Sequence, residues 1–226
     1  MKSYIIGDKN NKISLEAMNR CAKSFGHPLE IFQQTSPNTL KKHLTDFPGL
    51  LWTYPLNDMI ERIDDSAGMI LKSYKTSDVS KKWACTVSHA RLWKKCVELN
   101  EEIMILEHDA IFIRKFEPFD WEGGVLGLNH PRGATHSSYK FDEFVSLKKQ
   151  IQPAPYVLSK YAMPQGLAGN SAYIIKPYFA EKLLEKLKEK GFWPNDALMC
   201  LQFFPDDIKV IYPYYTQVQG LKSTTV

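Results

Sequence analysis

The chain lacks the features that identify several common classes of protein. No apolar run approaches the roughly twenty residues that a membrane-spanning helix needs, so we expect no membrane span. The first residues are too short in apolar length for a signal peptide. No glycine-rich phosphate loop is present, which excludes a Walker motif and a dinucleotide-binding fingerprint. The sequence also has no internal repeat and no low-complexity segment.

Cysteine is scarce and irregularly distributed along the chain. The 226 residues include only four cysteines, without regular spacing and without a C-x-x-C pair. This usage predicts reduced thiols and a cytoplasmic location. The net charge of +4 and the pI near 8.7 are compatible with a polyanionic partner without requiring one. The sequence carries no recognisable DNA-binding motif and no signal for an oligomeric state.

The most informative stretch is an apolar run that ends in acidic residues. Ile103 to Leu106 lead directly into Glu107, His108 and Asp109, as in a strand buried on both faces. Ligands in open α/β sheets bind at the carboxyl ends of such strands. Glu107 and Asp109 are two residues apart, so their side chains point the same way on an extended chain. Together they predict a site for the hard cation that a diphosphate needs. The alternative is a surface turn whose acids meet only water.

The start of the chain predicts a strand, a helix and a second strand. Residues 4–6 form a short apolar run, and Ser14 is the expected cap of a helix that continues to Phe25. Gly26 is expected to end this helix in the left-handed conformation. Residues 30–32 form the second strand. This order is typical of a parallel α/β sheet, and the loop at the end of the strand could hold a nucleotide base.

A strong helical pattern covers residues 83–99. Apolar residues occupy so wide a face that we expect deep burial. Cys85 and His89 are spaced i and i+4 and could both reach one zinc ion. Because the chain offers no second ligand pair, we expect His89 to be a core histidine and the helix to bind no zinc.

The second half of the chain continues the alternation of strands and helices. We predict a strand at 125–128, a small-residue loop at 164–171 that feeds a strand at 172–175, a helix at 177–190 and a last strand at 209–212. Asn195 is the expected cap of a short helix that continues to about Phe203. Residues 129–165 include a long polar and basic stretch, which we interpret as a mobile lid or acceptor-binding segment. A solvated loop is the alternative.

Four separated motifs resemble glycosyltransferase family 25, which includes enzymes of lipooligosaccharide synthesis. Ala84 to His89 is similar to the G-C-x-x-S-H motif of the family, and Ile105 to Asp109 resembles its I-L-E-D-D motif. Gly169 to Ile175 resembles its G-x-x-A-Y-x-(I/L) strand, and Pro194 to Asp196 its P-x-D element. The order and the spacing of the four also fit. The chain departs from the family at His108, where an aspartate is usual, and at Ala84, where a glycine is usual.

The resemblance implies a fold and a reaction. The expected fold is a single GT-A domain of α/β class, Rossmann-like, with a mixed, mainly parallel central sheet flanked by helices. Residues 1–128 would form the nucleotide-sugar-binding half and residues 129–226 the acceptor-binding half. The expected enzyme is a metal-dependent, inverting glycosyltransferase that uses Mn²⁺ or Mg²⁺ and a nucleotide-diphosphate sugar, with UDP-hexose as the expected donor.

The resemblance also suggests a role for each site residue. Asp109 and Glu107 would hold the metal and bind the donor, and Gly169 and Asn170 would contact the donor as well. Asp196 is the candidate general base, which an inverting transfer needs near the acceptor hydroxyl. Ser88 and His89 would support the metal-binding strand.

The acceptor and the activity have alternatives. The main hypothesis is a saccharide acceptor, as in lipopolysaccharide biosynthesis. Basic and aromatic residues also permit DNA modification, with a hydroxymethylated base of phage-type DNA as the acceptor. A third hypothesis is a non-catalytic binding module with a degenerate transferase fold, to which His108 in place of the usual aspartate would point.

Overall fold

A computed structural model describes residues 1–57, 61–132, 138–157 and 163–221 of the chain. The helices and strands, in chain order, are β1 (Lys2–Gly7), α1 (Lys12–Phe25), β2 (Glu30–Gln33), α2 (Pro37–His43), the 3₁₀ helix η1 (Leu44–Asp46), β3 (Arg62–Asp64), β4 (Met69–Leu71), α3 (Val79–Leu99), β5 (Ile103–Glu107), β6 (Ala110–Phe112), β7 (Val125–Gly127), α4 (Ser138–Ser146), β8 (Ile151–Pro153), β9 (Ala172–Ile175), α5 (Pro177–Lys190), α6 (Asn195–Leu198), β10 (Ile208–Ile211) and β11 (Thr216–Val218).

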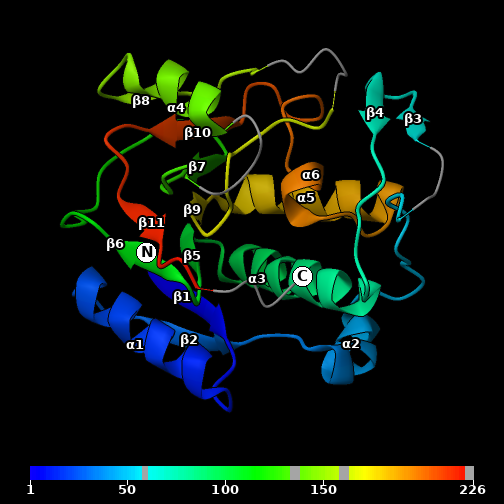
Figure 1. Cartoon of the computed structure of the whole chain (residues 1–226), viewed down its shortest axis with the longest axis horizontal. Helices are drawn as coiled ribbons and strands as arrows, with labels where there is room; N and C mark the ends of the chain where they lie inside the picture. Colours follow the sequence, from blue (N-terminus) through cyan, green and yellow to red (C-terminus); the bar gives the residue numbers. More distant parts are fainter. Residues whose placement is uncertain (58–60, 133–137, 158–162, 222–226) are drawn as a thin grey trace.

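The centre of the molecule is a seven-stranded sheet in the order β2-β1-β5-β9-β7-β10-β8 (Figure 1). Strands β2, β1, β5, β7 and β10 run in one direction, and β9 and β8 run against them. The predicted α/β class with a mixed, mainly parallel sheet flanked by helices is therefore confirmed. Strand β9 lies between β5 and β7, so residues from the second half of the chain complete the middle of the sheet.

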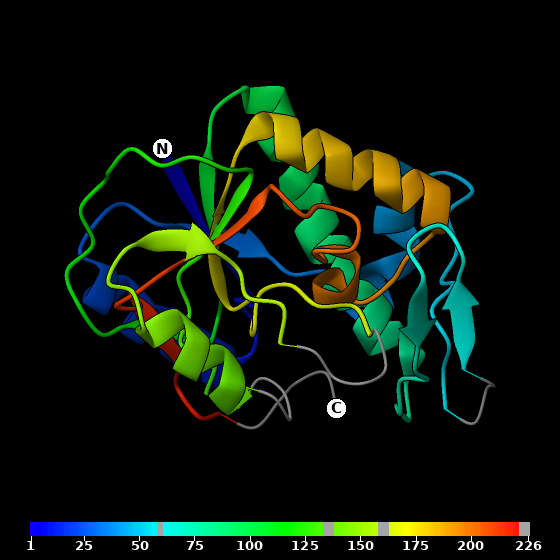
Figure 2. The ribbon, with the colours of Figure 1, turned by 90° about the horizontal axis from the view of Figure 1, so that it is seen from above.

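Alternating side chains of β5 pack in two hydrophobic cores, one on each face of the sheet. Ile103 and Ile105 pack in the core that also contains residues of α3 and α5. Met104 and Leu106 point to the opposite face and pack with residues of α1. Figure 2 shows α3 and α5 on one side of the sheet and α1 on the other. This alternation places the next residue, Glu107, on the α3 face.

Helix α3 is buried as predicted and begins four residues earlier than the sequence pattern indicated. The Asp78 side chain caps it by accepting a hydrogen bond of 3.0 Å from the backbone N–H of Ser80. Asn100 ends it in the left-handed conformation, with φ of 49°. Trp93 and Cys96 are fully buried, and so is His89, at 1% exposure.

Two of the predicted helix caps are wrong. Asn11, rather than Ser14, caps α1, because its side chain accepts a hydrogen bond from the backbone N–H of Ser14. The Ser14 hydroxyl instead accepts from the backbone N–H of Asp8. Asn195 lies inside α6 rather than at its cap, and α6 ends at Leu198 instead of near Phe203. The predicted end of α1 at Gly26, with φ of 71°, is confirmed.

The weakly patterned segments contain elements that the sequence did not indicate. Strands β3 and β4 form a two-stranded sheet in the segment between β2 and α3, which also contains the short helices α2 and η1. The predicted lid, residues 129–165, contains α4 and also β8, which is an edge strand of the central sheet. Its residues 133–137 and 158–162 lie outside the described residues. Closure of this segment over a donor stays a prediction.

The extended conformation expected through residue 109 is also wrong. Strand β5 ends at Glu107, and His108 and Asp109 form a turn that leads into β6. Strand β6 leaves the central sheet and pairs with β11, a strand that the sequence did not indicate. This pairing brings residues near the end of the described chain close to the acidic turn.

Among the helices that the structure describes, none combines the length and the apolar composition required to cross a membrane.

Candidate active site

The acidic turn is fixed by backbone contacts from distant parts of the chain. Glu107 pairs with Ile6 of β1, so the two strands end at the same edge of the sheet. The backbone N–H of Glu107 donates to the carbonyl oxygen of Ser171 over 2.7 Å, and the N–H of Gln219 donates to the carbonyl oxygen of Asp109 over 2.8 Å. Hydrogen bonds with two other segments of the chain therefore fix the backbone at both acidic residues.

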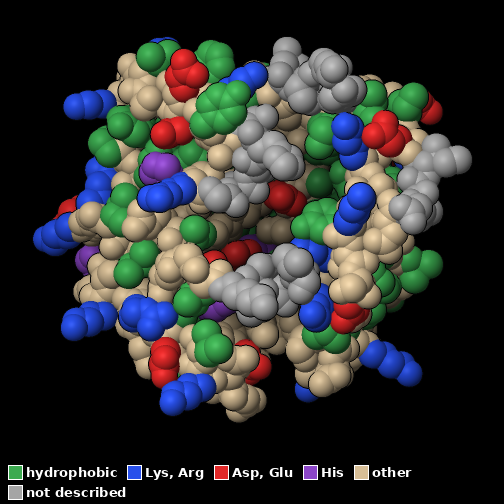
Figure 3. All heavy atoms as spheres, in the orientation of Figure 1, with side chains coloured by type: hydrophobic (Ala, Val, Ile, Leu, Met, Phe, Trp, Pro, Cys, Tyr) green, Lys and Arg blue, Asp and Glu red, His purple; other side chains and the backbone are tan. Residues whose placement is uncertain are grey.

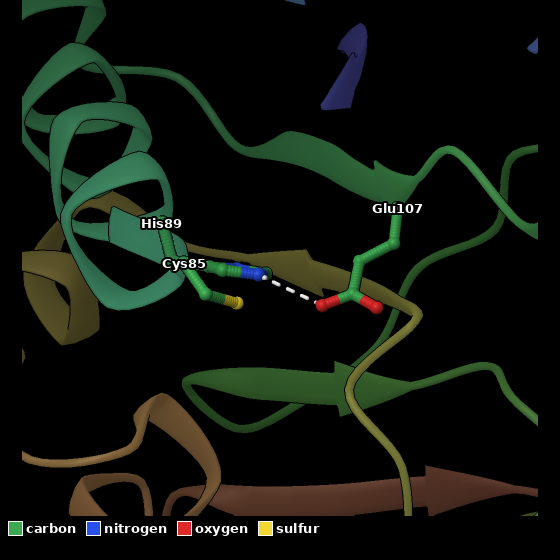
Figure 4. Close-up of side chains that lie close together, drawn as sticks. All are labelled: Cys85, His89 and Glu107. Carbon is green, nitrogen blue, oxygen red and sulfur yellow. Dashed lines mark hydrogen bonds and ion pairs between the residues drawn. The ribbon is translucent and has the colours of Figure 1, made fainter. Parts of the chain in front are cut away.

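A chain of hydrogen bonds runs from the core to Glu107. The Trp93 indole N–H donates to the Tyr173 hydroxyl over 3.0 Å, and that hydroxyl lies 2.8 Å from Nδ1 of His89. Nε2 of His89 lies 3.1 Å from Oε1 of Glu107. Trp93 can only donate, so the Tyr173 proton is available for Nδ1, and the Nε2–H of His89 then donates to the carboxylate. His89 thus orients Glu107, as Figure 4 shows.

Glu107 is held in its charged form. Burial alone would raise the pKa of Glu107, but the hydrogen bond from His89 and the electrostatic influence of His89, His108 and Lys82 outweigh burial and lower the pKa below its ordinary value. One carboxylate oxygen accepts from His89, and the other points away from it (Figure 4).

Asp109 differs from Glu107, because its pKa is raised rather than lowered. Its Oδ1 atom is buried and has no hydrogen-bond partner in the described structure. Burial, followed by repulsion from Glu107, raises the pKa of Asp109 to about 6. A buried, unpartnered carboxylate oxygen beside a second carboxylate is an arrangement that a bound cation would stabilise.

Asp196 lies in the first turn of α6, and its side chain reaches solvent. Its Oδ1 atom accepts a hydrogen bond of 3.0 Å from the backbone N–H of Ala197. Protein atoms surround the carboxyl closely enough for burial to raise its pKa, and the charge of Glu107 raises that pKa further. A group that is both accessible and closely surrounded lies in a concave part of the surface. Figure 3 shows such a hollow near the centre of this face, bordered by acidic side chains, in the region where Figure 1 draws α3 and α6.

Gly169 and Asn170 lie in the loop that leads into β9. Gly169 has φ of 91°, a conformation that favours glycine. Asn170 is 8% exposed, and neither polar atom of its amide has a partner within the described structure. Ser171, the next residue, accepts the Glu107 N–H. The unsatisfied amide of Asn170 is therefore adjacent in sequence to Ser171, whose backbone carbonyl binds the end of β5 at Glu107.

A groove runs from the acidic turn along the ends of β1 and β2. Its wall on one side is the first half of α3, and on the other the segment that follows β2. The lining residues are Ile6, Gln34, Thr35, Ser36, Pro37, Lys81, Ala84, Cys85, Ser88, His89, Glu107 and His108. The Ser88 hydroxyl accepts a hydrogen bond of 2.8 Å from the backbone N–H of Thr35 and so ties α3 to the segment after β2.

The structure brings some of the predicted site residues together and leaves others apart. Glu107 is coupled electrostatically to Asp109 and to Asp196. His130, a second side chain that could take a proton, contacts Arg132, Thr216 and Tyr214. Three contributors were missed: the Tyr173 hydroxyl, the Gln219 backbone and the grouping of Glu107 with Cys85 and His89. The i, i+4 spacing of Cys85 and His89 was the only sequence signal for that group.

Comparisons with known proteins agree with the fold and the site motifs. The chain matches Glycosyltransferase family 25 (LPS biosynthesis protein) over residues 1–199. No curated protein matches it. The apo structure of mouse Xyloside xylosyltransferase 1 is 9% identical with a TM-score of 0.39, and the match covers 89% of this chain and 80% of that chain. The apo structure of WbbM, a bifunctional glycosyltransferase, is 12% identical with a TM-score of 0.43, and the match covers 94% of this chain and 38% of that one.

The chain therefore spans well under half the length of WbbM. Both likenesses to solved structures are too distant to assign a substrate. The family match carries more weight, because it extends over most of the chain and includes the segments of Glu107, Asp109 and Asp196. On that match, the chain belongs to glycosyltransferase family 25.

Proposed function

We propose that the protein transfers a sugar from a nucleotide-diphosphate sugar, with UDP-hexose as the expected donor, to a hydroxyl group of a saccharide acceptor, with inversion at the anomeric carbon. The observation that carries the proposal is the electrostatic coupling of three carboxyl groups at one edge of the sheet. Burial raises the pKa values of Asp109 and of Asp196, and the charge of Glu107 raises both further, so the three carboxyl groups lie close enough to interact.

Asp109 and Glu107 are the proposed ligands of Mn²⁺ or Mg²⁺. The buried, unpartnered oxygen of Asp109 and the second oxygen of Glu107 are the hard oxygen donors that these cations prefer. Such a cation, when bound, neutralises the charge of the leaving diphosphate. His89 keeps Glu107 charged and oriented for this role.

The groove beside α3 is the proposed site for the nucleoside of the donor. It begins at Glu107 and ends near Gln34 and Thr35, at the carboxyl end of β2. Open α/β sheets bind nucleotides at this edge. The unsatisfied amide of Asn170 lies next to Ser171, which contacts Glu107, and it is the proposed hydrogen-bond partner of the donor.

Asp196 is the proposed base that takes the proton from the acceptor hydroxyl. Its carboxyl is open to solvent, where an acceptor can reach it, and its raised pKa makes it a better proton acceptor than an ordinary carboxylate. The negative charge of Glu107 supports this role because it favours a proton on Asp196 during the transfer. Nothing in the described structure favours a nucleic-acid acceptor.

A ligand screen tests the donor half of the proposal. We expect Mn²⁺ together with one class of nucleotide sugar, among UDP-, GDP- and CMP-sugars, to raise the melting temperature. A ligand at 100 times its Kd stabilises the native state by about 2.7 kcal/mol. Asp109→Ala should abolish this shift, and Asp206→Asn, which changes an exposed carboxyl, should not.

A transfer assay tests the acceptor half. We expect the donor found in the screen to be transferred to a glycan acceptor and not to hydroxymethylated DNA. Transfer to the DNA instead would replace the saccharide in the proposal. Cation-dependent donor binding without hydrolysis or transfer would favour a non-catalytic binding module.

A further inference from the structure

We propose that Cys85, His89 and Glu107 form a second cation site, selective for a thiophilic ion such as Zn²⁺, and that an ion bound there inhibits the enzyme by withdrawing Glu107 from the hard-cation site. The binding part of this inference stands on the three side chains alone. The inhibition part rests on the proposed function. Sequence analysis led us to expect no zinc here, because Cys85 and His89 lacked a further ligand; the fold supplies Glu107.

The three ligand atoms are already grouped. The Cys85 sulfur, a His89 ring nitrogen and a Glu107 carboxylate oxygen lie within 4.8 Å of one another. In Figure 4 the three side chains converge from α3 and from the end of β5. Zinc–ligand bond lengths place the ligands of a tetrahedral ion about 3.3 to 3.6 Å apart. The nitrogen–oxygen distance of 3.1 Å is close to this value, and the Cys85 sulfur, which lies within 4.8 Å of both atoms, would move closer to complete the geometry.

The site is preorganised, with room for a fourth ligand. Cys85 and His89 project from one face of α3, a helix whose packing fixes their backbone. The His89 side chain is 1% exposed, whereas that of Glu107 is 30% exposed and Cys85 is partly exposed. A cation bound by the three residues would therefore keep one side open to water, as three-ligand zinc sites do.

The groups behind His89 suit a metal-binding histidine. A zinc-bound imidazole usually donates its other N–H to a fixed oxygen. When Nε2 binds a cation, the proton of the neutral ring moves to Nδ1, and the Tyr173 oxygen 2.8 Å away can accept it. That oxygen has two acceptor lone pairs, so it can accept from Trp93 at the same time.

The charges around the pocket favour a cation. The carboxyl groups of Glu107 and Asp196 both act electrostatically on the Cys85 side chain. Their negative charges would attract a divalent cation to the three ligands. Binding would release the thiol proton to solvent and form the sulfur–metal bond.

The chemistry of the ligands separates the two cation sites. Mn²⁺ and Mg²⁺ prefer oxygen ligands, which Asp109 and Glu107 supply, whereas sulfur and imidazole ligands favour Zn²⁺. Glu107 is the one ligand that both sites share. Zn²⁺ bound to the oxygen of Glu107 that faces His89 would draw the carboxylate toward Cys85 and His89 and reduce the negative charge on its other oxygen. Glu107 would then bind the hard cation less well, which makes zinc an inhibitor whose effect an excess of Mn²⁺ opposes.

Cobalt binding tests the site without any donor or acceptor. With the thiols kept reduced, we expect the full chain to bind one Co²⁺ with a sulfur-to-metal charge-transfer absorption, and Zn²⁺ to displace it. Cys85→Ser should abolish the absorption, and Cys96→Ser, which changes a buried thiol elsewhere on α3, should retain it. Tyr173→Phe should weaken Zn²⁺ binding by roughly 10- to 100-fold.

Each outcome decides one part of the inference. Absence of the absorption in the unchanged chain, or its persistence in Cys85→Ser, would overturn the site. In the transfer assay, Cys85→Ser should raise the Zn²⁺ concentration for half-inhibition at least tenfold relative to the unchanged chain, whatever the transfer rate of the variant without zinc. Equal sensitivity of the two proteins to Zn²⁺ would overturn the inhibition part of the proposal. Asp109→Asn should retain the cobalt absorption while it loses Mn²⁺-dependent donor binding, so failure of the proposed function is distinguishable from failure of the zinc site.

Discussion

Asp109 is a residue whose charge should destabilise the fold in the absence of a cation. Its pKa is about 6 in the folded protein against an ordinary value of 3.8. Between these values the folded state binds more protons than the unfolded state, so stability falls as pH rises through that window. The cost is complete above about pH 6. It disappears at a pH below the unfolded value, where the carboxyl is protonated in both states.

Replacing this carboxylate should therefore stabilise the protein. We expect Asp109→Asn in the presence of a chelator to gain roughly 2 to 3 kcal/mol at pH 7, because the substitution removes the carboxyl group whose pKa the fold raises. For a chain of this size that corresponds to a rise in melting temperature of about 4 to 12 °C. The gain should vanish near pH 3.5. Thermal unfolding at the two pH values measures both effects.

An exposed acid provides the control. Asp206→Asn removes a carboxyl that faces solvent and should change the melting temperature little at either pH. A gain of similar size in Asp206→Asn would attribute the effect to net charge. A loss of stability in Asp109→Asn at pH 7 would mean that the carboxylate has a stabilising partner.

Substitution of Asp196 tests the proposed base on the acceptor side of the reaction. Asp196→Asn keeps the shape of the side chain and its hydrogen bond from Ala197, but it cannot take a proton. We expect kcat for transfer to fall by at least about 100-fold, the lower end of the range for a general base. Donor affinity should change little, since Asp196 makes no proposed donor contact. Steady-state kinetics with varied donor separates the two quantities.

The opposite pattern would reassign this residue. If Asp196→Asn weakens donor binding and keeps its turnover at saturation, Asp196 belongs to the donor site. Glu107 and His130 would then be tested as bases, although the contacts of His130 with Arg132 and Thr216 count against it. Asp206→Asn should leave both kinetic constants unchanged.

At the scale of elements, the sequence predicted the helices and strands whose burial requires a regular pattern of apolar residues. The continuous apolar run of β5 and the wide apolar face of α3 both follow directly from two-sided burial. Strands β8 and β11 were missed because each has only three residues and lies at an edge, where few apolar positions are required. Helix α4 was missed because it buries only Phe141 and Val145.

The candidate site was only partly predictable, for a different reason. Glu107 and Asp109 can be recognised in the sequence because they follow a buried strand. Their partners come from elements that approach the strand end in space: His89 from α3, Tyr173 from β9 and Gln219 from beyond β11. No local spacing encodes the register of one element against another. A single sequence therefore indicates the acids but not the groups that orient them.

The loop before β9 gives a prediction at the element scale. Gly166 forms a bridge with Cys200, and the adjacent carbonyl of Gln165 accepts from the backbone N–H of Leu201. A methyl group at residue 166 would overlap the carbonyl oxygen of Met199. We expect Gly166→Ala to cost about 1 to 3 kcal/mol of unfolding free energy, because the backbone cannot yield as a flexible side chain would.

This substitution should also disturb the site. The loop carries Asn170, and the segment after α6 to which it is bridged follows Asp196. Urea unfolding measures the cost, and donor titration measures the effect on the site. An unchanged unfolding midpoint would show that the loop can move away from Met199 without loss.

For the whole molecule, the position of β9 predicts a single folding unit. Strand β5 from the first half of the chain pairs with β9 from the second, and β9 also pairs with β7. A fragment of residues 1–128 would leave one edge of β5 unpaired and would remove α5 from the hydrophobic core that contains Ile103 and Ile105. We expect this fragment to be unfolded by circular dichroism.

The intact chain provides the comparison. Its far-ultraviolet circular dichroism and tryptophan fluorescence should report one coincident unfolding transition. A folded fragment, or two separated transitions in the intact chain, would show that residues 1–128 are stable without residues 129–226.

The parallel register of β1 and β5 also determines how the protein should be held in a binding experiment. Lys2 lies opposite Ile103, and Ile6 lies opposite Glu107, so the start of β1 is about 13 Å along the sheet from the acidic edge. Gln219, by contrast, is hydrogen-bonded to the backbone of Asp109. A tether or affinity tag placed ahead of Lys2 would leave the hollow facing away from a sensor surface, whereas one that follows Gln219 would start beside the acids and obstruct the ligands under study.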